Sequence, residues 1–286
     1  MKATPPWPGA WTDEGLCGYA RHVGPLWSDG ADALALRIET RHTNRTGRLH
    51  GGMGMGLVAM ALAQAAQRAV QAARPGATAV LLTQQCELID SAFEGEWVVA
   101  EARLLRTTRT LVFLTAQLCH GERVLLHASA VFQIEADAHK AAVPSSAPAP
   151  QVLPPGYALR EPVDAFSAHL APIHERIDAQ GERFGGFHVT PAFLDAQGGG
   201  GIDNGMLLLL ADLFLGRRAR MSSGWVCVTV GMGISRLAPV RLGDWVTFDS
   251  RAEGQNGETV VATGHFRVNE RPVMSATSLW KMVEKL

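Results

Sequence analysis

The chain has 286 residues, of which 47% are hydrophobic and 19% charged, and its formal net charge at pH 7 is -1. This length is sufficient for two domains of ordinary size, and the composition is typical of a globular protein rather than a disordered one. A nearly neutral chain has no overall attraction for nucleic acid or for an acidic membrane surface, so neither is expected as a partner.

Cysteine usage and the first residues favour a cytoplasmic protein. The four cysteines are far apart and form no CxxC pair, which indicates reduced thiols and no metal site: Cys17, Cys86, Cys119 and Cys227. Residues 1–8 contain no apolar stretch of the kind that signal peptides carry. The most apolar segment, residues 51–67, is short for a membrane span and contains Gln64, so we expect it to be a buried helix.

The first half predicts a strand, a long helix and then a meander of strands. Residues 1–30 are rich in Pro, Gly and Trp and indicate an ordered arm or a short helix. A strand is expected over 33–39, and a polar turn leads to a helix that ends near Arg74. Alternating apolar residues then predict four strands, over 79–88, 96–106, 110–119 and 124–134.

A change in composition separates this half from the rest of the chain. Residues 135–163 are dominated by Ala, Pro and Ser, which suits a semi-extended linker. We therefore expect an N-terminal domain over 1–137, a linker over 138–160 and a C-terminal domain over 161–286.

The second half repeats the plan of the first. The stretch Gly95-Glu96-Trp97-Val98 matches Gly243-Asp244-Trp245-Val246, and the offset of 148 (243 minus 95) continues without a gap through later pairs such as Thr115 and Thr263. A chance match would not keep one register across three strands. The helices align at an offset of 153, with His50 opposite Asp203. The repeat predicts an α+β fold made of two similar units.

The start of each long helix carries the candidate chemistry. His50-Gly51-Gly52-Met53 precedes an uncharged run and indicates a turn entering a buried helix, whose first amides have no partner within the helix and attract negative charge. The second half has Asp203-Asn204-Gly205 at this place and carries Asp212 within a Leu-rich run. We expect the two helices to lie together, with one active site assembled from both.

These residues resemble the motif of the hotdog-fold acyl-CoA thioesterases, particularly those of the phenylacetate pathway. Asn44, His50, Gly51 and Gly52 fit the front of that motif, and Asp212 falls at its acidic position, nine residues after the equivalent of the histidine. The resemblance implies a double hotdog, with two tandem domains in which an antiparallel β-sheet wraps a long central helix.

Each half lacks what the other retains. Ala59 occupies the acidic position of the first half, and Leu81 stands where the second half has Thr229, at the hydroxyl position of the following strand. Nine residues of helix rise about 13 Å, so a glycine at the start of a helix and an acid nine residues later cannot act on one thioester. The partner domain must therefore supply the acid, and the opposite site, with Asp203 facing Ala59, is expected to be inactive.

The resemblance implies a role for each motif residue. The amide of Gly51 would bind the thioester oxygen and stabilise the oxyanion. Asp212 would activate water as a general base or attack as a nucleophile, and these alternatives stay open. Thr229 would hold the water, while Asn44 and His50 would shape the loop and polarise the carbonyl.

Further candidates would contact the substrate, namely Gly52, Met53 and Arg109. Arg109 could meet the phosphates of coenzyme A, although an exposed strand edge would explain it equally well. We expect no metal and no separate cofactor, because coenzyme A enters as part of the substrate.

The expected function is hydrolysis of an acyl-CoA thioester to the free acid and CoA. The same fold also supports enoyl-thioester hydratases and dehydratases, for which His50 and Asp212 would provide the histidine and the acid. A non-catalytic acyl-CoA-binding module is a third alternative. The acyl group and a further dimerisation of the fused pair stay open.

Overall fold

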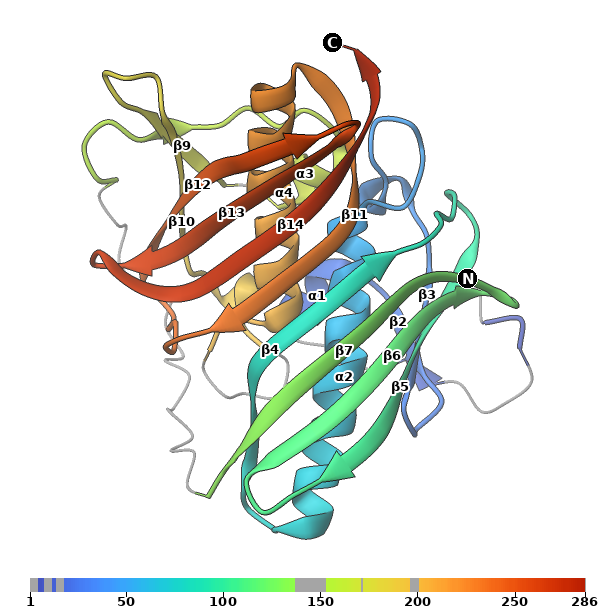
Figure 1. Ribbon diagram of the computed structural model, residues 1–286. Helices are drawn as coiled ribbons and strands as arrows, with labels where there is room; N and C mark the ends of the chain where they lie inside the picture. The colour runs from blue at the N-terminus through green and yellow to red at the C-terminus, as the bar shows by residue number, and fades with distance from the viewer. Residues whose placement is uncertain are drawn as a thin grey trace.

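The computed structural model describes residues 5–7, 12–13, 18–136, 153–170, 172–195 and 201–285. Within these residues, the strands form one 14-stranded sheet in which every pairing is antiparallel. The sheet curves around two long helices, α2 (Gly51–Ala73) and α4 (Asn204–Ser223) (Figure 1). This arrangement confirms the expected double hotdog.

The shorter helices and the strands divide evenly between the two halves. The first half contains α1 (Gly18–Val23), η1 (Thr40–His42), β1 (Thr12–Asp13), β2 (Leu26–Ser28), β3 (Ala33–Arg37), β4 (Thr78–Leu88), β5 (Trp97–Thr107), β6 (Leu111–His120) and β7 (Arg123–Glu135). The second contains β8 (Ala158–Leu159), α3 (Ala165–His169), β9 (His174–Ile177), β10 (Arg183–His188), η2 (Pro191–Phe193), β11 (Trp225–Arg236), β12 (Trp245–Asn256), β13 (Thr259–Val268) and β14 (Arg271–Lys285). β8 falls within the expected linker, whose residues 138–152 lie outside the described part.

The order of the strands shows how the halves join. It reads β1-β2-β3-β5-β6-β7-β4 and then continues β11-β14-β13-β12-β10-β9-β8, so the second half mirrors the first. β4 and β11 pair at the centre, for example through Cys86 and Met232. Each half thereby covers the strand edge that the other would leave open.

The structure confirms the sequence repeat down to its irregularities. The offset of 148 carries the bounds of β6 onto those of β13. A register shift between Leu81 and Thr83 in β4 recurs between Thr229 and Gly231 in β11, at the same offset. Such β-bulges bend a strand locally, so both halves curve around their helices in the same way.

Glycines set the distance between the two long helices. A Cβ atom on Gly205 would lie 2.7 Å from the carbonyl oxygen of Gly56, and one on Gly52 would lie 3.1 Å from the Cα of Leu209. Because higher numbers on α2 face lower numbers on α4, the helices run antiparallel. Only residues without a side chain permit backbones to approach this closely.

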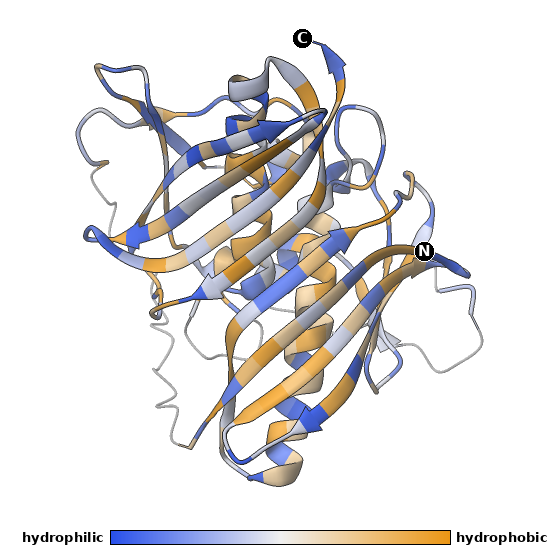
Figure 2. Ribbon diagram, in the orientation of Figure 1, coloured by the Kyte–Doolittle hydropathy of each residue, from blue (hydrophilic) through white to orange (hydrophobic). Residues whose placement is uncertain are grey.

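The core is continuous across the halves. Figure 2 shows apolar residues along both long helices and an alternation of hydrophilic and hydrophobic residues along many strands, as expected for sheets with one covered face. Buried side chains from both helices, including Leu57 and Leu208, belong to one cluster. Among the described residues, no helix is both long enough and apolar enough to span a bilayer.

Candidate active site

The candidate site lies where the first turn of α2 meets the middle of α4. The amide of Gly52 donates to Oδ2 of Asp212 at 2.9 Å, and the hydroxyl of Thr229 donates to its Oδ1 at 2.7 Å. Asp212 is 4% exposed. A buried carboxylate from the second half is therefore held against the positive end of a helix from the first half.

His50 completes the surroundings of this carboxylate. It precedes the first turn of α2, and its Nδ1 lies 3.2 Å from the amide nitrogen of Gly52 and 3.2 Å from Oδ2 of Asp212. Burial lowers the pKa of His50, and the negative charge of Asp212 opposes this effect. Nδ1 of His50 accepts from the Gly52 amide, so His50 caps the start of α2 beside Asp212. The Gly52 amide and the Thr229 hydroxyl are two donors that offset the cost of burying the carboxylate.

Gly51 leaves an open amide beside the acid. Within the described residues, no hydrogen bond from its N–H is present, as expected for the first residue of a helix. A Cβ atom at Gly51 would lie 2.9 Å from Cδ2 of Leu88, 3.3 Å from Oγ1 of Thr229 and 3.6 Å from Oδ2 of Asp212. A side chain here would fill the space beside the carboxylate. With the Gly52 amide engaged by Asp212, the Gly51 amide is the one available to an incoming oxygen.

Asn44 and Met53 lie near the site without touching the carboxylate. Oδ1 of Asn44 accepts hydrogen bonds from the backbone amides of Thr46 at 2.9 Å and Arg48 at 3.2 Å. It therefore shapes the turn that precedes α2. Met53 is buried in the first turn of the same helix.

Arg109 is not brought to these residues. It lies in the turn between β5 and β6, where its carbonyl oxygen accepts a hydrogen bond of 3.4 Å from Arg74, the residue that ends α2. The 23 residues of that helix span about 34 Å. Arg109 is thus at the opposite end of α2 from His50 and Gly51.

Phe166 contacts His50, and nothing in the sequence indicated this contact. This residue of α3 is buried, and its ring stacks on that of His50 with the centroids 3.9 Å apart. It lies 147 residues after Tyr19 of α1, its counterpart in the first half. Both helices are too short to show an apolar periodicity, so only their place in the repeat could have pointed to them.

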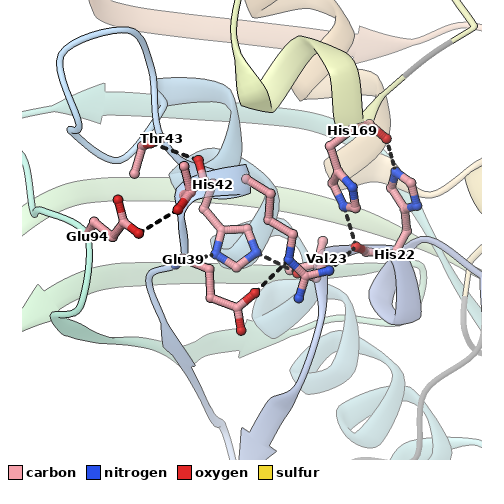
Figure 3. A network of polar contacts seen from close by, with 9 residues as sticks. His22, Val23, Glu39, His42, Thr43, Glu94 and His169 are labelled. Carbon is pink, nitrogen blue, oxygen red and sulfur yellow. Dashed lines mark hydrogen bonds and ion pairs between the residues drawn. The ribbon is translucent and has the colours of Figure 1, made fainter.

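A reciprocal pair of histidines joins α1 to α3. His22 and His169, also 147 residues apart, stack at 3.8 Å, and Nε2 of each ring bonds the carbonyl oxygen of the other residue (Figure 3). Each ring therefore carries its proton on Nε2. The approximate twofold axis of the molecule passes between these two residues.

The place that the repeat relates to this site, at the start of α4 and the middle of α2, lacks the groups found around Asp212. Asp203 accepts at Oδ1 from the amides of Gly205 at 2.7 Å and Met206 at 3.4 Å, so it serves as the N-cap of α4. Burial raises the pKa of Asp203 to about 7, while the bond from Gly205 opposes the rise. Ala59 and Leu81, which align with Asp212 and Thr229, are buried and apolar.

The N-terminal arm also occupies this second place. A Cβ atom on Gly56 would lie 2.6 Å from the hydroxyl of Tyr19, which is buried without a hydrogen-bond partner. Burial raises the pKa of Tyr19, and Asp203 adds to the rise. Among the residues that the structure describes, no group of three or more His, Cys, Asp or Glu side chains is arranged to hold a metal ion.

Comparisons with known proteins identify the family. The family model described as Thioesterase superfamily matches residues 46–127. A Pseudomonas aeruginosa protein, PA0474, provisionally described as an esterase, is 31% identical over 101 residues, which cover 35% of this chain and 73% of that protein. The chain therefore belongs to the thioesterase superfamily, and the protein is a thioester hydrolase.

Solved structures share the complete double fold. The tesB protein MAP1729c of Mycobacterium avium subsp. paratuberculosis superposes with a TM-score of 0.66 at 11% identity, over 93% of this chain and 98% of its own. The acyl-CoA thioesterase II TesB2 of Mycobacterium marinum gives 0.64 at 13% identity, over 92% and 96% of the respective chains. At these identities the likeness establishes the fold alone.

Proposed function

We propose that this protein hydrolyses an acyl-CoA thioester at a single composite site between its two halves. The main support is the hydrogen bond of 2.9 Å that joins Asp212 of one half to the helix-start amide of Gly52 in the other. This bond puts an acid, an open amide and a hydroxyl around one small space, which are the groups that acyl transfer to water requires.

The proposed reaction uses these groups as follows. The thioester oxygen accepts a hydrogen bond from the amide of Gly51, which stabilises the negative charge as the carbonyl carbon is attacked. Asp212 either removes a proton from the attacking water or attacks the carbon itself, in which case water releases the acid from an anhydride in a second step. In the general-base route the carbon–sulfur bond then breaks, and the proton taken from water neutralises the departing thiolate. In the nucleophilic route the thiolate leaves as the anhydride forms and takes a proton from solvent, and water then splits the anhydride into the free acid and Asp212.

Replacement of the acid tests this proposal. In Asp212→Asn, which preserves the shape of the side chain, we expect thiol release from acyl-CoA to fall roughly 100-fold or more, because a positioned base is lost. Binding of an unreactive thioether analogue, measured by calorimetry, should change little. Asp32→Asn, at an exposed ion pair with Arg68, is the matched control. Unchanged turnover in Asp212→Asn would remove Asp212 from the mechanism.

The 3.2 Å contact between His50 and Asp212 also supports a hydratase or dehydratase as a second candidate. Loss of absorbance from crotonyl-CoA without thiol release from any acyl-CoA would favour that reaction. Because the sequence motif resembles that of phenylacetate-pathway enzymes, phenylacetyl-CoA should be among the acyl-CoA substrates tested. A protein that binds these thioesters without converting them would instead be a binding module.

A further inference from the structure

Four arginines from three elements converge beside the proposed active site with little negative charge to balance them. Arg217 and Arg220 are on α4, Arg183 is on β10, and Arg160 directly follows β8. Two of them share one carboxylate, because Nη1 of Arg217 lies 2.5 Å and Nη1 of Arg183 lies 2.8 Å from the oxygens of Glu175. The helix dipole favours cations near the end of α4, but it does not account for arginines that come from other elements.

One member of the cluster is incompletely satisfied. Nη1 of Arg160 is buried and has no hydrogen-bond partner. Burial lowers the pKa of Arg160 to about 10, and the nearby positive charge of Arg217 adds to this effect. A buried guanidinium N–H without an acceptor costs free energy that an anion at this place would recover.

The cluster lies near the site. Phe166 of α3 stacks on His50, and Asp164 is the N-cap of the same helix. The charges of Asp164 and Arg220 influence the pKa values of both His50 and Arg160. Along α4, Arg217 and Arg220 lie five and eight residues beyond Asp212, which is about 8 and 12 Å of helix rise. Around the axis, Arg220 lies about 80° and Arg217 about 140° from Asp212, so an extended ligand that contacts Asp212 reaches Arg220 first along α4.

The first half lacks the cluster. At the helix offset of 153, the positions equivalent to Arg217 and Arg220 are Gln64 and Gln67. Gln67 instead serves the fold, because its side chain bonds the backbone of Ala77 at 3.1 Å and of Ala79 at 2.9 Å. The arginines thus occur on the same helix as Asp212, and both are missing from the equivalent helix.

We propose that Arg160, Arg217 and Arg220 bind a phosphate group of the coenzyme A portion of the substrate. This inference rests on the proposed function. Guanidinium groups match phosphate oxygens with paired hydrogen bonds, and the thioester would then lie toward Asp212 with the nucleotide end of CoA along α4.

Two substrates that differ in phosphate test the proposal. One is an acyl-CoA, and the other is the same acyl group on N-acetylcysteamine, which carries no phosphate. For Arg220→Gln we expect KM for the acyl-CoA to rise about tenfold or more, and to rise by that factor more than KM for the phosphate-free thioester. For Arg220→Lys, KM for the acyl-CoA should lie between the values of the wild type and of Arg220→Gln. Arg251→Gln, which removes an equally positive but exposed side chain paired with Glu253, is the control.

Direct binding separates this inference from the proposed function. Calorimetry with CoA alone should show weaker binding to Arg220→Gln than to Arg251→Gln even if neither protein releases thiol. Equal CoA affinity and equal KM in these two variants would overturn the inference while leaving hydrolysis intact. A second pocket, of about 390 Å³, is lined by Arg21, Arg41, His22 and His169. If KM rose in Arg21→Gln and not in Arg220→Gln, the phosphate would bind in that pocket, and the inference would be overturned.

Discussion

Two buried aspartates of the second half, one at the start and one in the middle of α4, have different surroundings. Asp212 accepts from Thr229 and from the amide of Gly52 across the helix interface. Within the described part of the chain, Asp203 accepts from amides of its own helix, Gly205 and Met206. The first arrangement presents a carboxylate to a space shared by both halves, and the second closes the end of one helix. The same residue type therefore serves the site in one case and the fold in the other.

This difference predicts a pH-dependent stability that Asp203 controls. Its pKa of about 7 in the folded protein is above the ordinary value of 3.8, so between about pH 4 and 7 the folded state retains a proton that the unfolded chain has lost. The free energy of unfolding contributed by Asp203 should therefore fall as pH rises through this window and level off above it, by on the order of a few kcal/mol.

Urea unfolding of the wild type and of Asp203→Asn at pH 5 and pH 8 measures this effect. Asparagine can still cap the helix, but it does not titrate. The stability of the variant relative to the wild type should increase with pH. Asp195, Arg236 and Tyr19 also face Asp203, but they are present in both proteins, so their own effects largely cancel in the comparison. Parallel pH dependences would contradict the prediction. Thiol release should remain near the wild-type rate, since Asp203 does not contact Asp212.

At the scale of elements, the active-site geometry depends on how closely α2 and α4 approach. In Gly205→Ala the new methyl group would lie 2.7 Å from the carbonyl oxygen and 3.0 Å from the Cα of Gly56, so the helices must separate. We expect a loss of about 1–3 kcal/mol in the free energy of unfolding, together with lower activity as Asp212 moves away from Gly52.

Gly254→Ala is the matched control for this change. Gly254 lies in β12, and a Cβ atom there would meet no other atom within 4 Å. Urea unfolding and thiol-release assays of both variants decide the question. Stability and activity equal to those of the control would show that the helix contact does not set the site geometry.

The long elements were predictable from the sequence, and the short ones were not. Alternation and the offset of 148 predicted the strands from β4 to β7 and from β12 to β14 within a few residues. The sequence did not indicate Phe166, because α3 has five residues and no periodicity. The arginine cluster was also missed, since its members are up to 60 residues apart (220 minus 160) and only the folded chain brings them together. Arg109 was selected by charge alone, and the sequence could not show that its turn lies at the far end of α2.

At the scale of the whole molecule, the repeat has two similar halves but one complete set of site residues. Asp212, Thr229 and the start of α2 come together, whereas the positions that align with Asp212 and Thr229 are the apolar residues Ala59 and Leu81. We therefore expect one molecule of an unreactive acyl-CoA analogue to bind per chain. Isothermal titration calorimetry measures this stoichiometry, and two equal sites per chain would show that the second place also accepts the ligand.

The pairing of β4 with β11 has a consequence for how the protein behaves at low concentration. When identical subunits build such an interface, dilution separates them and the site between them is lost with the complex. Here one polypeptide contains both partners, so their local concentration is set by the chain and not by the amount of protein in solution. Each chain would therefore keep its two halves paired, and the site between them intact, even at a very low protein concentration.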